Sequence, residues 1–310
     1  MTTAFLYAGH GAQATGMGRD LYEKYPTFKA VYDTADRIKP GLKDIIFENK
    51  DEVLTQTENT QPALVAFAIG VTKLLEEKNV FPETTLGLSL GEYSALYGAG
   101  AFTEETALKA VAFRGEAMKK AGKGGVWGMS AVLGMEPSEL EKICEQAGCY
   151  PTNYNCPGQI VISGEKEKVD KAGELAKEAG ARRVLPLKVS GPFHTPYMKS
   201  AGDALAEYLP TIDIKPLRVR VFFNATGDDG SVKLLTDEKA KITDLLVRQV
   251  QNPVRLENSL TALLQEGYDD FVEIGPGKTL SGFVKKCAKP LGIKDFSVRT
   301  INTAEDIENL

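Results

Sequence analysis

The sequence predicts an α/β protein with a mainly parallel sheet and a small inserted unit. Strand-like and helix-like segments alternate through most of the 310 residues, which is typical of a parallel sheet with helices on both faces. Between residues 125 and 190 the order changes to β-α-β-β-α-β, that of a ferredoxin-like unit. A glycine-flanked serine, Ser89, also stands where a strand is followed by a helix. We therefore predict a larger unit, residues 1–124 and 191–310, interrupted by an insert of residues 125–190.

The first predicted strand, residues 4–8, is followed by a loop with four glycines between Gly9 and Gly18. Such a loop can turn several backbone N–H groups toward one anion, which suits a phosphate or an oxyanion equally. The loop does not match G-x-G-x-x-G and no P-loop lysine follows, so a nucleotide site is not favoured. A flexible turn between a strand and a helix is an equally good interpretation.

Two helices are predicted next. Residues 28–38 keep the apolar spacing of a helix. The segment from Asn59 to Pro62 is typical of a helix start with proline at or near the first helical position, and helical spacing continues over residues 64–75. Gln61 would lie at the mouth of this helix, where a capping role is favoured over contact with a ligand.

Residues 87–91 match the G-x-S-x-G pattern of a nucleophile elbow. Residues 84–86 are predicted to form a short buried strand before it, and residues 92–97 a helix after it. Such a turn exposes the side chain of Ser89 and places the positive end of the helix dipole at the site. The backbone N–H of Leu90 would then point to where an oxyanion forms. The alternative is an ordinary turn flanked by glycines.

Arg114 stands among apolar residues in a helix predicted from residue 103 to about residue 122. An arginine in such a setting usually extends its guanidinium to the surface. The alternative is a pocket in which the guanidinium binds a carboxylate through two hydrogen bonds. The residues alone favour an exposed guanidinium, and a buried guanidinium in a pocket stays the alternative.

The remaining elements are predicted from apolar spacing and from glycine and proline at segment ends. In the insert, strands are predicted at residues 126–133, 150–155, 159–163 and 183–189, and helices at residues 137–147 and 166–179. After the insert, strands are predicted at residues 219–224 and 271–274, and helices at residues 237–250, 256–265 and 280–287, the last of which closes the fold.

A serine nucleophile needs a general base, usually histidine, because its hydroxyl is a weak acid at neutral pH. The chain has only two histidines, His10 in the glycine-rich loop and His194 between Phe193 and Pro196. With so few candidates, a purely structural role for both is a weak alternative. No aspartate or glutamate stands in a setting distinctive enough to be identified as a triad acid.

Composition indicates a soluble globular protein, with 43% hydrophobic and 25% charged residues. The net charge of −5 argues against general affinity for nucleic acid or an anionic membrane, and no apolar run is long enough to span a bilayer. The first residues lack the basic region of a signal peptide. Four cysteines without a C-x-x-C pair, and only two histidines, make a zinc site unexpected and favour a reducing cytoplasm.

Several motifs together resemble those of malonyl-CoA:acyl carrier protein transacylases and of the acyltransferase domains of fatty acid and polyketide synthases. The resemblance covers nearly the whole chain, and the motifs follow the family's order. They are Gly9-His10-Gly11-Ala12-Gln13, Thr60-Gln61-Pro62-Ala63, Gly87-Leu88-Ser89-Leu90-Gly91-Glu92-Tyr93, Arg114-Gly115, Asn155-Cys156-Pro157-Gly158-Gln159, Gly191-Pro192-Phe193-His194, Asn252-Pro253-Val254 and Glu273-Ile274-Gly275-Pro276-Gly277. The family fold has an α/β-hydrolase-like large subdomain with a ferredoxin-like insert, in agreement with the predicted elements.

By position, the resemblance implies that Ser89 is the nucleophile and His194 its base. The histidine would be oriented by a backbone carbonyl, that of Gln249, rather than by a carboxylate. The backbone N–H groups of His10 and Leu90 would form the oxyanion hole.

The resemblance also implies three residues that contact the substrate. Arg114 would pair with the free carboxylate of the malonyl group, and Gln61 would line the pocket. Phe193 resembles the malonyl-selective version of the family, in which a bulky ring leaves no room for a 2-methyl branch. The sequence departs from the family at His10, which replaces the usual glutamine, and at Leu88, which replaces a common histidine. Both changes alter the side chains around the nucleophile.

The implied reaction is a ping-pong transfer of malonyl from malonyl-CoA to the phosphopantetheine thiol of an acyl carrier protein, supplying fatty acid synthesis. The expected enzyme is a cytoplasmic monomer that needs no metal or redox cofactor and binds neither nucleic acid nor membrane. Three alternatives stay open: a discrete acyltransferase of a polyketide assembly line, a serine hydrolase that uses water as acceptor, and a carrier-binding protein without catalysis.

Overall fold

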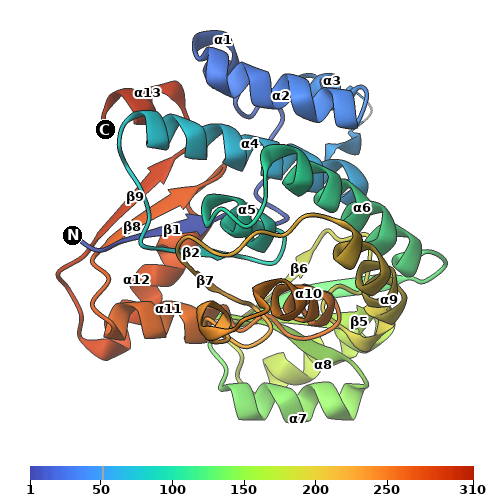
Figure 1. Cartoon of the computed structure of the whole chain (residues 1–310). Coiled ribbons are helices and arrows are strands. Elements are labelled where there is room, and N and C mark those ends of the chain that lie inside the picture. The colour runs from blue at the N-terminus through green and yellow to red at the C-terminus, as the bar shows by residue number, and fades with distance from the viewer. Residues whose placement is uncertain (51) are drawn as a thin grey trace.

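The computed structural model describes residues 1–50 and 52–310 and contains two separate sheets (Figure 1). The larger sheet is parallel throughout. Its strands, in order across the sheet, are β7 (Arg220–Phe222), β2 (Thr84–Gly87), β1 (Thr3–Tyr7), β8 (Asp270–Ile274) and β9 (Ser297–Ile301). The predicted fold class, a parallel α/β sheet with an inserted second unit, is confirmed.

Helices cover both faces of the parallel sheet because both faces of its central strand are apolar. Successive side chains of a strand point to opposite faces, so Phe5 and Tyr7 lie in one core and Ala4 and Leu6 in the other. The first core is completed by α2 (Pro26–Ile38), α4 (Thr57–Glu77), α5 (Gly91–Gly98), α6 (Glu104–Gly122), α9 (Lys199–Tyr208) and α10 (Glu238–Gln249). The second is completed by α11 (Leu256–Gln265) and α12 (Thr279–Leu291). In Figure 1, α2 lies with α1 (Arg19–Lys24) and α3 (Leu42–Phe47) in an outer layer over α4.

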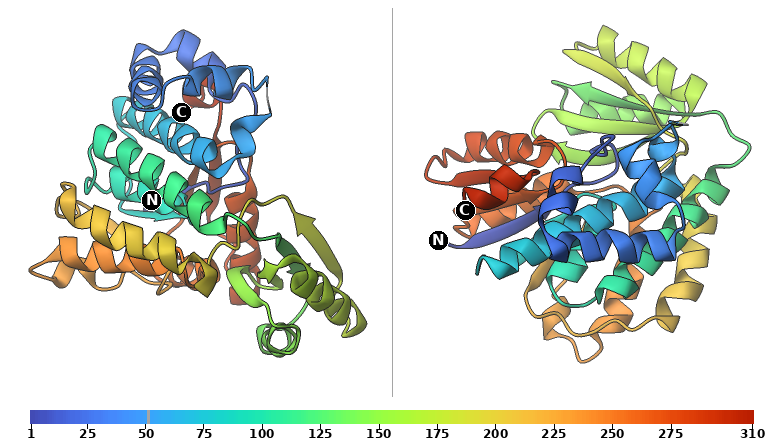
Figure 2. Two further views of the ribbon diagram at one scale, coloured as in Figure 1. Left: turned by 90° about the vertical axis from the view of Figure 1, so that its right-hand side faces the viewer. Right: turned by 90° about the horizontal axis from the view of Figure 1, so that it is seen from above.

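The smaller sheet is antiparallel and belongs to a lobe that projects from the larger unit (Figure 2). Its strands, in order, are β4 (Tyr150–Cys156), β5 (Gln159–Glu165), β3 (Trp127–Leu133) and β6 (Arg183–Leu187). Helices α7 (Pro137–Ala147) and α8 (Lys166–Glu178) share an apolar core with one face of this sheet. Backbone hydrogen bonds between Val254 and β4 fasten the lobe to the larger unit. The strands and helices of the lobe run from Trp127 to Leu187.

The start of α4 differs from the prediction. The helix begins at Thr57, and Pro62 lies inside it. The first turn forms because the carbonyl of Gln56 accepts from two backbone N–H groups, while Asn59 and Thr60 donate through their side chains to carbonyls of the preceding 3₁₀ turn. These contacts start the helix five residues before the proline, so Gln61 is not at its mouth, and the capping interpretation of this residue is wrong.

Several elements are missing from the prediction. Residues 280–287 do not close the fold, because β9 and α13 (Ala304–Glu308) follow them. Strand β9 is an edge strand whose side chains are half-buried except for Ile301, so it lacks the apolar run that reveals a central strand. The helices α1, α3 and α9 were not predicted either.

Within the described residues, no helix is long and apolar enough to cross a membrane.

Candidate active site

The nucleophile elbow forms where β2 turns directly into α5. Ser89 has a φ of +52°, in the left-handed region that non-glycine residues rarely adopt. The turn is so tight that a Cβ on Gly87 would lie 1.9 Å from the carbonyl carbon of Gly91, and a Cβ on Gly91 would lie 2.2 Å from the carbonyl oxygen of Tyr7. Both flanking residues must therefore be glycine. A strained serine of this kind costs about 1–3 kcal/mol and persists only where its surroundings hold it.

Ser89 and His194 are in hydrogen-bonding contact, with 2.8 Å between Oγ and Nε2. The other ring nitrogen, Nδ1, lies 2.8 Å from the backbone carbonyl oxygen of Gln249. A carbonyl can only accept, so Nδ1 carries the proton and Nε2 is left as an acceptor for the serine proton. No carboxylate contacts this histidine within residues 1–50 and 52–310. The geometry suits a nucleophile and a base oriented by a carbonyl.

Burial controls the protonation state of both histidines. It lowers the pKa of His194 to about 4, although the hydrogen bond to the Gln249 carbonyl acts in the opposite direction. It likewise lowers the pKa of His10 to about 4, with the positive charge of Arg114 as a second cause. Both rings are therefore neutral at pH 7, and a neutral His194 can accept a proton.

Arg114 is completely buried, so the expectation that it extends to the surface is wrong. Its Nη1 donates to Oε1 of Gln61 at 2.9 Å, and its Nη2 donates to Oε1 of Gln249 at 2.9 Å and to Oγ of Ser89 at 3.3 Å. The guanidinium also lies 5.4 Å from the ring centre of Tyr93. Burial lowers the pKa of this arginine. No carboxylate pairs with it in the described part of the chain, although a buried cation is costly without a counter-charge.

The glycine-rich loop packs on the elbow through its backbone. A Cβ on Gly9 would come within 2.3 Å of the carbonyl oxygen of Leu88. The backbone N–H of His10 belongs to the residue after this contact, and that of Leu90 belongs to the residue before α5. Neither N–H donates to another backbone group of the described residues. An oxyanion hole requires donors without a backbone partner.

A cavity of about 470 Å³ opens in front of the elbow, between the larger unit and the lobe. Ser89, His194, His10, Leu88 and Phe193 line it on one side. The lobe contributes mainly the face of its sheet that is turned away from α7 and α8, including Met129, Ala131, Asn153, Asn155, Val161 and Leu187. Arg114, Gln61 and Gln249 do not line the cavity and lie behind the nucleophile. No group of three or more histidine, cysteine, aspartate or glutamate side chains could hold a metal ion among the residues described.

The structure thus brings together most of the residues expected at the site. Ser89, His194, Gln249, Arg114 and Gln61 form one hydrogen-bonded network. Phe193 and His10 stand apart from this network, with their rings 5.8 Å from each other.

Two functional candidates were missed by the sequence analysis, Asn224 and Glu92. Asn224 accepts a hydrogen bond from the backbone of Ser89, and Glu92 accepts one from the backbone of Asn224. Signals were present, because Glu92 is an acid directly after the G-x-S-x-G pattern and Asn224 is the polar end of a predicted strand.

The chain is similar in sequence and in structure to known acyltransferases. The family model "Acyl transferase domain" matches residues 4–304. The chain is 45% identical to the malonyl CoA-acyl carrier protein transacylase of Bacillus subtilis (strain 168), over 97% of this chain and 95% of that protein. It is similar in structure to an acyl carrier protein S-malonyltransferase of Vibrio cholerae, with a TM-score of 0.91, 35% identity, and coverage of 100% and 99% of the two chains. A malonyl-transacylase in complex with a type II PKS acyl-carrier protein also matches, with a TM-score of 0.91, 33% identity, and coverage of 100% and 98%.

Proposed function

Because this chain belongs to the acyl transferase domain family, we propose that it transfers the malonyl group of malonyl-CoA to the phosphopantetheine thiol of an acyl carrier protein. The observation that carries the proposal is a buried guanidinium to which the described residues offer no carboxylate partner. It lies 3.3 Å from the hydroxyl of a serine that also contacts a histidine. A malonyl thioester supplies both groups that this arrangement lacks, a carbonyl for Ser89 and a carboxylate for Arg114.

In the first half-reaction, His194 Nε2 takes the proton of Ser89 as Oγ attacks the thioester carbon. The carbonyl oxygen becomes an oxyanion, which the backbone N–H groups of Leu90 and His10 would stabilise. The carbon–sulfur bond then breaks, the thiolate of coenzyme A takes the proton from the histidine, and a malonyl ester remains on Ser89.

The second half-reaction reverses these steps with a new thiol. His194 takes the proton of the phosphopantetheine thiol, whose sulfur attacks the ester. The carbon–oxygen bond breaks, and Ser89 Oγ recovers the proton from the histidine. Proton and acyl transfers balance in both halves without an oxidant or reductant, so we propose that no cofactor takes part.

Arg114 and Phe193 would select the acyl group. Arg114 lies behind Ser89, so the malonyl carboxylate would have to pass the serine to reach it. There it could take over the position that the amide oxygens of Gln61 and Gln249 hold beside the guanidinium. Phe193 lines the cavity next to His194, where its ring would restrict a branch at the carbon between the two carbonyl groups.

We further propose fatty acid synthesis as the pathway, and a monomer in the cytoplasm as the working form. The similarity to the Bacillus subtilis transacylase supports the first, and four unpaired cysteines support a reducing compartment. A role in polyketide synthesis is the second candidate, because one similar structure contains a type II PKS acyl-carrier protein. Transfer rates to purified carriers of the two kinds would distinguish the pathways.

Intact-mass analysis after mixing with malonyl-CoA tests the proposal. We expect a malonyl adduct on the wild-type chain and none on Ser89→Ala. A serine hydrolase would lose the adduct to water without a carrier, and a binding protein would form no adduct and release no coenzyme A.

A further inference from the structure

We propose that Asn224 and Glu92 form a positioning device that holds Ser89 in its strained conformation and so keeps its hydroxyl on His194. The inference rests on the proposed function in that Ser89 must be the nucleophile. Neither Asn224 nor Glu92 lines the cavity, so both would act through the elbow and not by contact with the substrate.

Asn224 uses all of its polar groups in one crosslink. It is completely buried. Its Oδ1 accepts from the backbone N–H of Ser89 at 2.6 Å, and its Nδ2 donates to the carbonyl oxygen of Gly87 at 2.7 Å. Its own carbonyl accepts from the backbone N–H of Arg255 at 2.9 Å. One side-chain amide thus ties down the backbone on both sides of Leu88, where the turn is tightest.

Glu92 fixes the position of Asn224 through a hydrogen bond. Its Oε2 accepts from the backbone N–H of Asn224 at 2.6 Å, and the carboxyl is completely buried in the first turn of α5. The other oxygen, Oε1, is buried without a hydrogen-bond partner among the described residues. Burial raises the pKa of this carboxyl to about 8, so it is mostly neutral at pH 7. An unpaired buried oxygen is costly, so the role we infer for Glu92 is its contact with Asn224 and not general stability.

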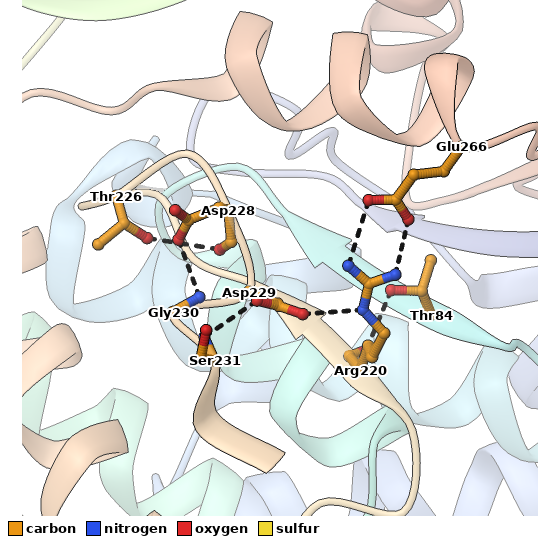
Figure 3. A network of polar contacts seen from close by, with 8 residues as sticks. All are labelled: Thr84, Arg220, Thr226, Asp228, Asp229, Gly230, Ser231 and Glu266. Atoms are coloured by element: carbon orange, nitrogen blue, oxygen red, sulfur yellow. Dashed lines mark hydrogen bonds and ion pairs between the residues drawn. The ribbon is translucent and has the colours of Figure 1, made fainter. Parts of the chain in front are cut away.

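Strand β7, which ends two residues before Asn224, is fixed at its first residue, Arg220 (Figure 3). The Arg220 side chain donates to Asp229 at 2.9 Å and to both oxygens of Glu266 at 2.6 and 3.3 Å, and its carbonyl accepts from Thr84 at 3.1 Å. Asp229 follows Asn224 in the chain, so this arginine joins the segments before and after it. The crosslink therefore starts just after a fixed strand.

The crosslink has a direct consequence for the oxyanion site. The N–H of Ser89 is occupied by Asn224, while the carbonyl of Ser89 accepts from Nε2 of Gln249 at 2.8 Å. Both backbone polar groups of the serine are thus bound by side chains from distant segments, and the N–H of Leu90 has no backbone partner among residues 1–50 and 52–310. Loss of the crosslink would let the serine relax and move both Oγ and the Leu90 N–H.

The burst of coenzyme A on mixing with malonyl-CoA measures the acylation rate. We expect Asn224→Ala to slow it by about 10²-fold, with the KM for malonyl-CoA changed less than about 3-fold, because geometry and not binding is lost. Asn224→Asp keeps the acceptor for Ser89 N–H but loses the donor to Gly87, so an intermediate loss is expected. Glu92→Gln retains a carbonyl acceptor and should stay within about 3-fold of wild type, whereas Glu92→Ala should lose about 10-fold or more.

Ser297→Ala is the control for stability alone. It removes a hydrogen bond to the buried carboxylate of Asp270, at the first residues of β8 and β9 and away from the elbow, and should lower the melting temperature without slowing acylation. A folded Asn224→Ala that acylates at the wild-type rate would overturn the inference, as would equal rates for Glu92→Gln and Glu92→Ala. If the Asn224 variants do not fold, the two Glu92 variants decide. A wild-type chain that forms no adduct would refute the proposed function instead.

Discussion

Gln249 serves the site through two different groups. Its backbone carbonyl contacts His194, and its side-chain amide joins Arg114 to the backbone of Ser89. The parts that would recognise the acyl carboxylate, activate the serine and orient the base therefore meet at one residue. A substitution at Arg114 should therefore affect the reactivity of Ser89 as well as the recognition of the substrate.

Replacing Arg114 separates these two effects if two acyl donors are compared. Arg114→Ala should cost about 2–5 kcal/mol in kcat/KM for malonyl-CoA, as truncation of one partner of a buried charge pair does. Acetyl-CoA has no second carboxylate and should suffer only the loss that comes from the disturbed contacts with Gln61 and Gln249. Equal losses for the two donors would show that Arg114 is purely structural.

Substitutions at the two histidines should have opposite effects on acyl-enzyme formation. His194→Ala should slow acyl-enzyme formation by about 10²–10⁴-fold, because a general base is lost. His10→Gln should keep most of the activity, because its expected contribution is a backbone N–H that survives the substitution. A folded His10→Gln that is as inactive as His194→Ala would contradict the assignment.

The pH dependence of kcat/KM gives a check on the same assignment. Protonated His194 cannot accept a proton, so activity should fall as the pH drops through about 4 and stay level from there toward neutrality. His10 has a pKa of about 4 as well, so the wild-type profile alone does not identify the base. The acid limb should persist in His10→Gln, and its disappearance there would point to His10.

Candidate site residues could be predicted where a local sequence motif indicates them. The glycines around Ser89 indicated a nucleophile, and the scarcity of histidines left two candidate bases, between which only the resemblance chose. The carbonyl partner on Gln249 came only from resemblance, because any residue can supply a carbonyl. Asn224 and Glu92 were not predicted, because their contact joins segments 132 residues apart in the chain.

At the scale of elements, the turn from β2 to α5 is the feature on which the site depends most. Gly87→Ala would place a carbon against backbone that cannot move aside, so it should destabilise the fold by about 3 kcal/mol or more. Gly282 in α12 is the matched control, because a Cβ there meets nothing within 4 Å. Gly282→Ala should gain up to about 1 kcal/mol from helix propensity. Urea unfolding measures both, and a Gly87→Ala of wild-type stability would contradict the geometry.

Elements were predictable where an apolar core selects them. The strands and helices of the lobe, and most of those around the parallel sheet, carry periodic apolar faces that match their cores. Edge strand β9 and the short outer helices have no such face, and they were missed. The start of α4 was misplaced because the bonds that begin it come from a neighbouring 3₁₀ turn and not from the proline.

At the scale of the whole molecule, the two units meet at the cavity, and lysines stand beside it. Lys188 lines the cavity, and Lys286 of α12 donates to Gln159, which lines it as well. The chain is acidic overall, with a net charge of −5, so an acidic carrier protein would need a local positive region. We expect docking near these two lysines.

Charge reversal tests this docking face. Lys188→Glu and Lys286→Glu should raise the KM for the carrier and reduce its dependence on salt, while leaving loading from malonyl-CoA nearly unchanged. Lys171→Glu is the control, because this exposed lysine lies on α8, which covers the face of the lobe sheet away from the cavity. A carrier KM that is insensitive to salt and to both reversals would place the docking face elsewhere.

The central claim is that Ser89 carries a malonyl group from coenzyme A to a carrier thiol. The most direct test is a chase: the enzyme is loaded with malonyl-CoA, freed of excess substrate and mixed with a phosphopantetheinylated carrier, and both proteins are weighed by mass spectrometry. The malonyl mass should leave the enzyme and appear on the carrier within the dead time of manual mixing. Loss of that mass from the enzyme with an unmodified carrier, or an enzyme that never gains it, would contradict the account.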